Sequence, residues 1–434
     1  MIRALILTVA MTLAFPAASA VQPVEVTSPG GIKAWLLQDE TIPFAALEIF
    51  FIGGTSLDPT GKRGAVRLMT NLLEQGAGDL NAQDFAAARD DLAAQFGFAS
   101  SADGISVSAT FLSENRESAL DLFALALNKP RFDYDAIERA RAQILASQAA
   151  SAKDPEAIAF NAAAATIYGE HPYGSDDNGT AQSVGALTRE DIQSAYRAAL
   201  ALDRLVIAAA GDISAAELGA ALDKLLGTLP KQGASLPPRA QPNYVAGVSI
   251  KDFPGPQSSI HFTQPGLNIK DPDFLAAMAV NEILGGGRFS ARLMREIRDK
   301  RGLTYGVNTA LASMKFAETM VGSLQVSNDK VSEAIDVLRA EWAKLASGDI
   351  TQAELDAAKK YMIGSYPMRW DGNEIIAAIL VEMQNDGISI DYPKTRNDRV
   401  RALTLDEVNR VARRLMRPDQ LQITIVGQPN PTPK

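Results

Sequence analysis

The spacing of apolar and polar residues along the chain predicts a mixture of strands and helices. The stretch "IKAWLLQDETIPFAALEIFFIG" (32–53) is typical of one or two strands, and "ADGISVSATFL" (102–112) alternates with the period of two expected of a half-buried strand. Alanine-rich stretches at 114–127 and 135–152 favour helices. Because these elements do not follow a regular strand–helix–strand rhythm, we predict an α+β fold.

One predicted helix, "GAVRLMTNLLEQGAG" (64–78), carries a polar stripe on a mostly apolar surface. Its polar residues are spaced i, i+3, i+4 and i+7, so they share one face of the helix: Arg67, Thr70, Asn71 and Glu74. Solvent is the simplest partner for such a face. A functional site is the alternative, and the helix pattern alone does not decide between them.

The chain repeats itself with a spacing of about half its length. Four segments recur in the same order, 210 to 216 positions later: Asp58-Pro59 as Asp271-Pro272, Asn71 as Asn281, "ALTREDI" (186–192) as "ALTLDEV" (402–408), and Gly211 as Gly427. We therefore predict two homologous domains in tandem, each a mostly antiparallel sheet packed with helices. The predicted domains span 21–228 and 248–434, and the proline-rich segment 229–247 is the predicted linker.

Each predicted domain ends with a capped helix followed by a strand. Thr188 and Thr404 stand immediately before these helices, where a threonine hydroxyl can accept a hydrogen bond from a free backbone amide.

The first 20 residues, "MIRALILTVAMTLAFPAASA", are typical of a secretory signal peptide. Arg3 supplies the basic start, the apolar run is too short for a mature membrane span, and Ala18-Ser19-Ala20 has the form of a cleavage site. The chain contains no cysteine, which excludes disulfides and thiolate metal sites. We expect an exported protein of a bacterial periplasm, with no membrane span in the mature chain.

Charge and histidine content restrict the possible chemistry. The net charge of −9 argues against nucleic acid as a partner. Only two histidines are present, His171 and His261, so one chain cannot build a three-histidine metal site. His171 lies in the loop "YGEHPYGSDDNGT" (168–180) and His261 in a predicted strand, and a structural role is the simpler interpretation of both.

The segment "LGGGRFSARLMREIRDKRGLTYGV" (284–307) is the main candidate for chemistry. Ser290 can cap a helix that runs to about Lys300, and Gly302 can end it in a left-handed conformation before a strand that begins near Tyr305. Arg298 and Tyr305 could then lie close together and donate hydrogen bonds to peptide carbonyl groups. The alternative is a solvated arginine face, because arginines recur at 292, 295 and 298 with helical spacing. A phosphate loop is disfavoured, because no Gly-Lys-Ser/Thr sequence follows the glycines.

These features together resemble the M16 zinc metallopeptidases, the family of insulinase, pitrilysin and the mitochondrial processing peptidases. The resemblance covers nearly the whole chain after residue 20. It depends on the duplicated halves, the "HPYG" loop with the later "LTREDI", and above all "RFSARLMREIRDKRGLTYGV" (288–307). That last segment is similar to the family's C-terminal signature, which implies that Arg298 and Tyr305 contact substrate.

The resemblance also gives the polar stripe of the first helix a meaning. Active members carry a His-x-x-Glu-His zinc motif on this helix, whose spacing brings two imidazoles to one metal ion and a glutamate to the bound water. Here the three positions hold Arg67, Thr70 and Asn71, and no acid stands near 147–148, where the resemblance places the last ligand. We therefore expect no metal and no cofactor in this chain.

What the resemblance implies is a non-catalytic, substrate-binding subunit of a heterodimeric periplasmic zinc metalloendopeptidase. A partner subunit of the same family would carry the His-x-x-Glu-His motif and the zinc, and this chain would add Arg298 and Tyr305 to the peptide bound there. The alternative is an inactive scaffold or peptide-holding protein that works without a peptidase partner.

Overall fold

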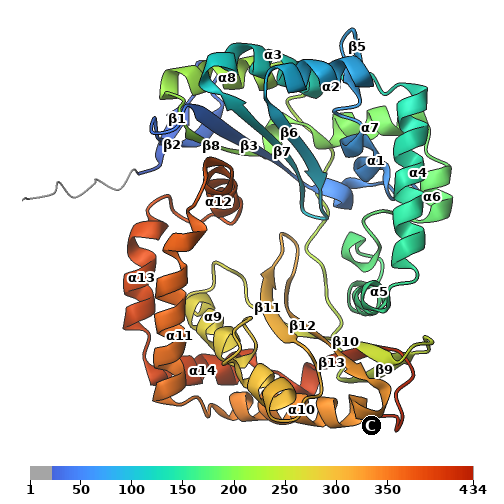
Figure 1. Ribbon diagram of the computed structural model, residues 1–434, viewed down its shortest axis with the longest axis vertical. Helices are drawn as coiled ribbons and strands as arrows, with labels where there is room; N and C mark the ends of the chain where they lie inside the picture. The colour runs from blue at the N-terminus through green and yellow to red at the C-terminus, as the bar shows by residue number, and fades with distance from the viewer. Residues whose placement is uncertain (1–21, 434) are drawn as a thin grey trace, which may run out of the picture.

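The computed structural model describes residues 22–433 and consists of two halves, one above the other in Figure 1. The N half, residues 22–228, holds one sheet, and the C half, residues 247–433, holds a second sheet. The signal-peptide prediction for residues 1–20 lies outside the described residues. Within the described part of the chain, no helix is long and apolar enough to span a membrane.

The N-half sheet has six strands in the order β1-β2-β8-β3-β7-β6. All neighbouring strands are antiparallel except β2 and β8. The strands are β1 (Val24–Thr27), β2 (Lys33–Gln38), β3 (Phe44–Ile52), β6 (Gln95–Ser100), β7 (Gly104–Leu112) and β8 (Leu205–Gly211), and the short pair β4 (Gly76–Ala77) and β5 (Leu80–Asn81) lies apart from them.

The C-half sheet has five strands in the order β11-β12-β10-β13-β9. Only β13 and β9 are parallel. The strands are β9 (Gly247–Lys251), β10 (Gln257–Pro265), β11 (Val307–Ser313), β12 (Glu318–Ser327) and β13 (Gln422–Val426). Read from the opposite edge, this order repeats β2-β8-β3-β7-β6 strand by strand, with the one parallel pair in the same place. The predicted duplication of a mostly antiparallel α+β unit is therefore confirmed.

Helices cover the sheets of both halves (Figure 1). Those of the N half are α1 (Ala65–Asn71), α2 (Ala82–Asp91), α3 (Arg116–Asn128), α4 (Tyr134–Ser151), α5 (Pro155–Tyr168), α6 (Ala181–Gly185), α7 (Arg189–Ala199) and α8 (Ala215–Leu226). Those of the C half are α9 (Phe274–Leu284), α10 (Val331–Ser347), α11 (Gln352–Ser365), α12 (Asn373–Asn385), α13 (Tyr392–Ala402) and α14 (Leu405–Leu415), together with the single-turn η7 (Pro367–Arg369).

The two predicted helix caps are present. Thr188 accepts a hydrogen bond from the amide of Asp191 at the start of α7, and Thr404 accepts one from Glu407 at the start of α14. In both cases the acidic side chain bonds back to the threonine amide, which completes a reciprocal cap. The repeated "ALT" signal therefore has the same local cause in both halves.

Alternation along the central strands divides each sheet into two faces. In β3, Leu47, Ile49 and Phe51 pack in the main core of the N half, whereas Ala46 and Phe50 point to the other face. In β10, Ile260 and Phe262 pack in the core of the C half, and His261 points to the opposite face. The faces that point away from the two cores are those on which the halves meet.

Each half packs one helix on the sheet of the other half. Helix α12 of the C half packs on β8 and β3 of the N half, and α5 of the N half packs on β10 and β13 of the C half (Figure 1). These two helices occupy corresponding places in the repeat. Gln384 of α12 donates to the carbonyl of Ile207 in β8 at 2.8 Å, so backbone atoms also take part in the contact.

The segment between the halves has no helix or strand from 230 to 246, but it is fixed at several points. The carbonyl of Ala234 accepts from the Arg204 guanidinium at 2.6 Å, and the amide of Ala240 donates to Phe316 at 2.8 Å. This segment therefore touches both halves along its path.

Candidate functional site

Helix α1, which carries the polar stripe, is short and firmly anchored. Gly64 adopts a left-handed conformation with φ of 94° at its start, and the carboxylate of Asp58 accepts from the amides of Gly64 and Val66, both at 2.8 Å. Burial raises the pKa of Asp58 to about 6, although these amides favour the charged form. The helix ends at Asn71, earlier than the sequence pattern predicts, and residues 72–74 form turns.

The stripe itself is not uniformly open. Thr70 is fully buried, and its hydroxyl donates to the carbonyl of Val66 at 2.8 Å within the same helix. Arg67 is partly buried and lines a cavity, and its buried Nε has no hydrogen-bond partner. Asn71 is also only partly buried. Of the three positions 67, 70 and 71, only 70 is therefore fully buried.

Helix α4 supplies the neighbouring wall, at the place where an acid is absent from the sequence. Gln148 donates from its amide nitrogen to the carbonyl of Asn178 at 2.8 Å, and its Oε1 is buried without a partner. Among the described residues, no group of three or more His, Cys, Asp or Glu side chains could hold a metal ion.

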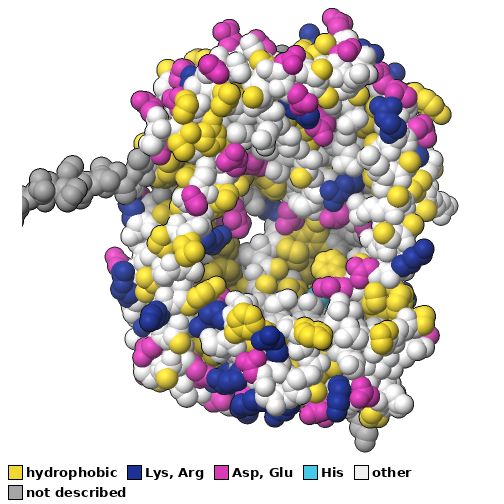
Figure 2. Space-filling view, viewed as in Figure 1, with side chains coloured by type: hydrophobic (Ala, Val, Ile, Leu, Met, Phe, Trp, Pro, Cys, Tyr) yellow, Lys and Arg dark blue, Asp and Glu magenta, His cyan; other side chains and the backbone are white. Residues whose placement is uncertain are grey.

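The cavity that Arg67 lines lies between the two halves. It has a volume of about 820 Å³ and is bordered by α5 and the loop 175–178 on one side and by β10, β11 and β12 on the other. A hollow is visible at the centre of the space-filling view (Figure 2). Four acidic side chains line the cavity: Asp154, Glu156, Asp176 and Asp177.

His261 of β10 borders the same cavity, as expected for a residue on a strand. Its ring lies edge-on to Phe160 of α5, with 5.5 Å between ring centroids. Burial lowers the pKa of His261 to about 4, so the ring is neutral near pH 7. His171, the second histidine, has a structural role: its Nδ1 accepts from the amide of Tyr173 at 3.2 Å, and its Nε2 lies 3.1 Å from the carbonyl of Pro238.

The segment 284–307 differs in detail from its prediction. Ser290 lies in a turn and caps no helix, and residues Met294–Asp299 form a π-helix instead of an α-helix. Gly302 does adopt the predicted left-handed conformation, with φ of 61°, and its amide donates to the carbonyl of Arg298 at 2.8 Å. The strand that follows, β11, begins at Val307, two residues after Tyr305.

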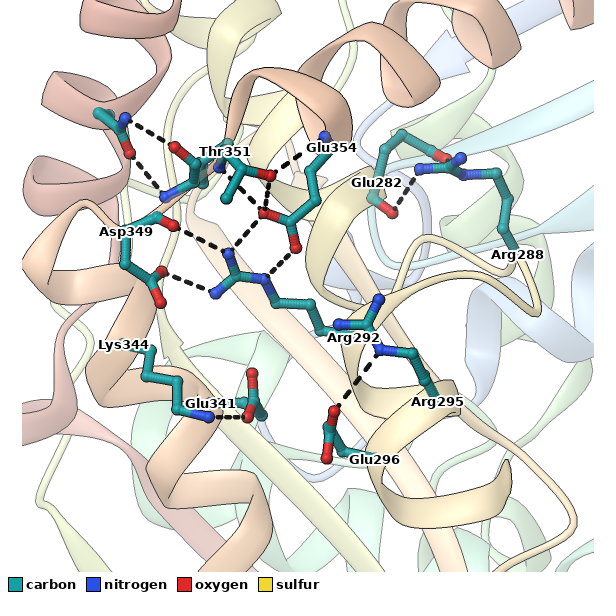
Figure 3. Close-up of polar contacts among 12 residues, drawn as sticks. Glu282, Arg288, Arg292, Arg295, Glu296, Glu341, Lys344, Asp349, Thr351 and Glu354 are labelled. Atoms are coloured by element: carbon teal, nitrogen blue, oxygen red, sulfur yellow. Dashed lines mark hydrogen bonds and ion pairs between the residues drawn. The ribbon is translucent and has the colours of Figure 1, made fainter. Parts of the chain in front are cut away.

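The three arginines of this segment do not share one solvated face. Arg292 is only 5% exposed and donates two hydrogen bonds to the carboxylate of Glu354, at 2.7 and 2.8 Å, and one to the carboxylate of Asp349 at 2.7 Å (Figure 3). Arg295 is exposed and lies near Glu296, at 3.5 Å. The interpretation of Arg292 as a solvated residue is therefore wrong, because helical spacing does not report the acidic partners that α11 and the loop before it supply.

Arg298 and Tyr305 lie on the two sides of the Gly302 turn. The guanidinium of Arg298 is 3.3 Å from Asp299, and it stacks 4.9 Å from the centroid of the Phe289 ring. Tyr305 is 91% exposed, the most open of the large apolar side chains in the described chain. Among the described residues no hydrogen bond or ring contact joins the two side chains, so the role assigned to this pair stays a prediction.

The residues on either side of Tyr305 are hydrogen-bonded to each other. The hydroxyl of Thr304 donates to the carbonyl of Gly306 at 2.8 Å and accepts from the amide of Gly306 at 3.2 Å, which makes a tight turn around Tyr305. The residue borders a smaller cavity of about 250 Å³, which also includes His261 and Glu156. Tyr305 thus stands beside the space between the halves.

Comparison with known proteins places these features in a family. The family described as "Insulinase (Peptidase family M16)" matches residues 33–180, and the one described as "Peptidase M16 inactive domain" matches residues 186–362. Together they cover most of the chain. The chain belongs to the M16 family.

Relatives and solved structures agree with this M16 assignment. A non-peptidase homolog, YmxG of Helicobacter pylori, is 25% identical over 377 residues, which is 86% of each chain. An uncharacterized zinc protease of Mycobacterium bovis is 27% identical over 92% of each chain. The crystal structure of a peptidase M16 inactive domain from Pseudomonas fluorescens is 29% identical, covers 95% of this chain and 99% of its own, and superposes with a TM-score of 0.88.

Zinc does not fit the residues of this M16 chain. A guanidinium at Arg67 would repel a divalent cation, the Thr70 hydroxyl is fully buried and already bonded, and Gln148 presents a neutral amide. At positions 67 and 148, the buried polar atoms without partners are Arg67 Nε, a hydrogen-bond donor, and Gln148 Oε1, an acceptor, and the two do not make a ligand set. The residues at the positions of the family's zinc motif therefore do not form a zinc site.

The sequence did not reveal that α5 forms one wall of the cavity. Its stretch "PEAIAFNAAAATIY" is alanine-rich on most sides and gives little indication of which face is covered. Phe160, a large apolar residue among these alanines, was the one indication in the sequence that this side of α5 contacts something other than solvent.

Proposed function

We propose that this M16 chain is the non-catalytic, substrate-binding subunit of a heterodimeric periplasmic zinc metalloendopeptidase. The zinc and the catalytic glutamate would belong to a partner subunit that carries the His-x-x-Glu-His motif. This chain would close the partner's active site and add Tyr305 and Arg298 to the bound peptide. The periplasmic location rests on residues 1–20 of the sequence.

The observation that carries the proposal is that helix α1 lacks the residues of a zinc site, whereas Tyr305 still presents an exposed hydroxyl. The metal positions hold Arg67, Thr70 and Asn71, yet a phenol that makes no hydrogen bond within the described chain is held open beside the central space. An exposed phenol on a tight turn can donate one directed hydrogen bond to a peptide carbonyl oxygen of a second molecule. Part of that bond's effect would arise as negative charge develops on the oxygen.

A scaffold without a peptidase partner is the second candidate. It is favoured by the position of Arg298, whose guanidinium is occupied by Asp299 and Phe289. It is also favoured by the similarity to a relative described as a non-peptidase homolog. In that case Tyr305 would have no catalytic consequence.

The test uses this chain co-purified with an M16 partner that carries His-x-x-Glu-His, and a fluorescence-quenched peptide as substrate. Tyr305→Phe removes one hydroxyl and leaves the fold unchanged, so we expect kcat to fall by about 10²–10³ with unchanged zinc content of the complex. Arg298→Ala should raise KM more than it lowers kcat if the arginine contributes uniform binding.

Arg295→Ala is the matched control, because Arg295 is an exposed arginine on the same helical segment. It should leave both constants unchanged. If the Tyr305 and Arg298 variants form the complex and hydrolyse the peptide at the wild-type rate, the substrate-contact role is wrong and the scaffold is the better function.

A further inference from the structure

The C half contains a second large cavity, separate from Tyr305 and Arg298. It has a volume of about 880 Å³ and lies among the start of α9, η7, α12 and α13. Its walls are largely apolar and aromatic, with these side chains: Phe274, Leu275, Met278, Leu311, Tyr366, Trp370, Ile379, Met383, Ile388 and Tyr392. A space of this size and lining is typical of a site for a small ligand or a short peptide.

Three arginines line this cavity, and none of them has a carboxylate partner within the part of the chain that the structure describes. Arg396 of α13 is only 5% exposed, and its Nη1 donates to the carbonyl of Met362 and to the side chain of Asn397, both at 2.9 Å. Arg369 and Arg399 are exposed at the rim. Buried arginines are normally paired with an acid, so Arg396 is unusual.

Aromatic rings stack against two of these arginines. The guanidinium of Arg396 stacks 4.2 Å from the centroid of Tyr366, and that of Arg399 lies 5.6 Å from the centroid of Tyr392. Stacking on a ring leaves the edge of a guanidinium, with its hydrogen-bond donors, free for a ligand. Burial lowers the pKa of Arg396, and nearby Arg369 acts in the same direction, whereas Tyr392 and Tyr366 act against this shift. An anion at this place would favour the charged guanidinium.

The acidic residues of the cavity do not neutralise the arginines. Asp271 forms two hydrogen bonds to Arg414, at 2.9 and 2.6 Å, and Asp391 pairs with Lys394 at 2.6 Å. Both of these cations lie outside the cavity lining.

The two other acids of the lining are Glu382 and Asp386, both on or just after α12. Burial, with the negative charge of Glu382, raises the pKa of Asp386 to about 6, whereas two lysines, Lys315 and Lys270, act against that rise. The positive charges that favour the ionised form of Asp386 are thus those of lysines, not of the three arginines. The arginine side of the cavity is left positive.

From this geometry we infer that the cavity binds the free C-terminal carboxylate of a peptide, with Arg369, Arg396 and Arg399 around the carboxylate and the preceding apolar residues on the aromatic wall. Guanidinium groups match carboxylates through paired hydrogen bonds, and aromatic walls favour large apolar side chains. An inorganic anion would use the arginines and leave most of the apolar wall uncovered, so the wall favours a peptide end. This site lies on the chain itself and does not depend on a catalytic partner.

The experiment measures binding of a fluorescein-labelled hexapeptide ending in phenylalanine to the full-length mature chain by fluorescence anisotropy. The free-acid peptide should bind at least about tenfold more tightly than the same peptide with a C-terminal amide, because the amide removes the charge. Arg369→Gln and Arg399→Gln should each weaken binding of the free acid by roughly five- to twentyfold and reduce its advantage over the amide.

Rim variants are used because Arg396 also bonds the Met362 carbonyl, and its loss could unfold α13. Arg401→Gln is the matched control: this arginine lies on the same helix, is paired with Asp398 and does not line the cavity. It should bind both peptides as the wild type does. Equal binding of acid and amide, unchanged affinity in both rim variants, or displacement by inorganic phosphate as effective as by unlabelled free-acid peptide would each overturn the inference.

Discussion

Helices α5 and α12, each of which packs on the sheet of the other half, hold the same place in the repeat but cover very different sheet faces. The face of the N-half sheet under α12 is mainly apolar, although it also carries Glu48, and these apolar side chains lie on it: Ala46, Phe50, Val206, Ala208 and Ala210. The face of the C-half sheet under α5 carries polar side chains at the corresponding strands: Ser259, His261, Thr263, Gln422 and Thr424.

The helices differ in the same way. Ala377, Leu380 and Val381 of α12 are buried against the N-half sheet, where the alanines of β8 allow a close approach. Helix α5 buries mainly alanines, exposes Phe160, and leaves the central cavity of about 820 Å³ beside it. Duplication thus produced one contact that holds the halves together and another that leaves room for a ligand, and the sheet faces decide which is which.

The largest expected effect tests the apolar contact directly. Leu380→Ala removes a fully buried side chain between α12 and the N-half sheet, and we expect a loss of about 3 kcal/mol in the free energy of unfolding. Phe160→Ala on α5 should cost less than about 1 kcal/mol, because this ring is more than half exposed. Urea-induced unfolding followed by circular dichroism measures both. Equal losses would contradict the distinction between the two contacts.

The next effect concerns the ion pairs that anchor the helical segment 292–299 of the C half. In the N half, α1 is anchored by one carboxylate, that of Asp58, whereas this segment is anchored by Arg292 with two carboxylates. Arg292→Ala leaves Glu354 and Asp349 without their cation, and because both acids are partly exposed we expect a loss of roughly 2–3 kcal/mol. Arg295→Ala should change the free energy of unfolding by less than about 0.5 kcal/mol.

The pH dependence of the Arg292 effect provides a further check. Burial would raise the pKa of Glu354, but its hydrogen bonds from Arg292 hold that pKa down at about 2. The stabilisation is therefore present above pH 4.5 and is lost as the pH falls toward 2. A destabilisation by Arg292→Ala that stayed constant down to pH 2 would show that packing, and not the ion pair, is responsible.

A smaller effect tests the apolar character of the face that α12 covers. Glu48 of β3 lies between Ala46 and Phe50 on this face, and burial raises its pKa to about 7, although the hydroxyl of Ser106 favours the charged form. The folded chain therefore holds this proton more tightly than the unfolded chain does, and stability falls as the pH rises from about 4.5 through 7. Glu48→Gln should be more stable than wild type at pH 8 by roughly 1 kcal/mol and equal to it at pH 4. A variant that is less stable at both pH values would contradict this account.

The smallest expected effect concerns the metal positions of the N half. The triple variant Arg67→His, Thr70→Glu, Asn71→His should still bind no stoichiometric zinc by elemental analysis. The position of Thr70 is fully buried, and α4 offers Gln148 in place of an acid. Adding Gln148→Glu gives the comparison variant with a complete ligand set. One zinc per chain in the triple variant would show that another residue acts as the last ligand.

Much of the fold could be predicted from local patterns. The alternation in 32–53 and 102–112 produced β2, β3 and β7, and the "ALT" signals produced the capped starts of α7 and α14. These features depend on periodicity and on neighbours within a few residues, which the sequence records directly. The absence of metal ligands at 67, 70 and 71 had a different source: only the resemblance to the M16 family placed the zinc motif at these positions.

Tertiary contacts decided the remaining features. The helical spacing of arginines at 292, 295 and 298 could not show that Arg292 turns inward to Glu354 and Asp349, because those partners lie 57 to 62 positions away in the sequence. Nor could it show that Arg298 stacks on Phe289 while Tyr305 stands open. Nor could the sequence show that Arg369 of η7 lines the same cavity as Arg396 and Arg399 of α13.

The sequence alone determined which residues share a face of each strand. The face that points away from the core is therefore mainly apolar in the N-half sheet and mainly polar in the C-half sheet. Only the tertiary structure decided that α12 covers the first face and α5 the second. Helix pairing across two halves depends on long-range burial of surface, and a helix such as α5, with alanines on most sides, carries too little periodic signal to specify its partner.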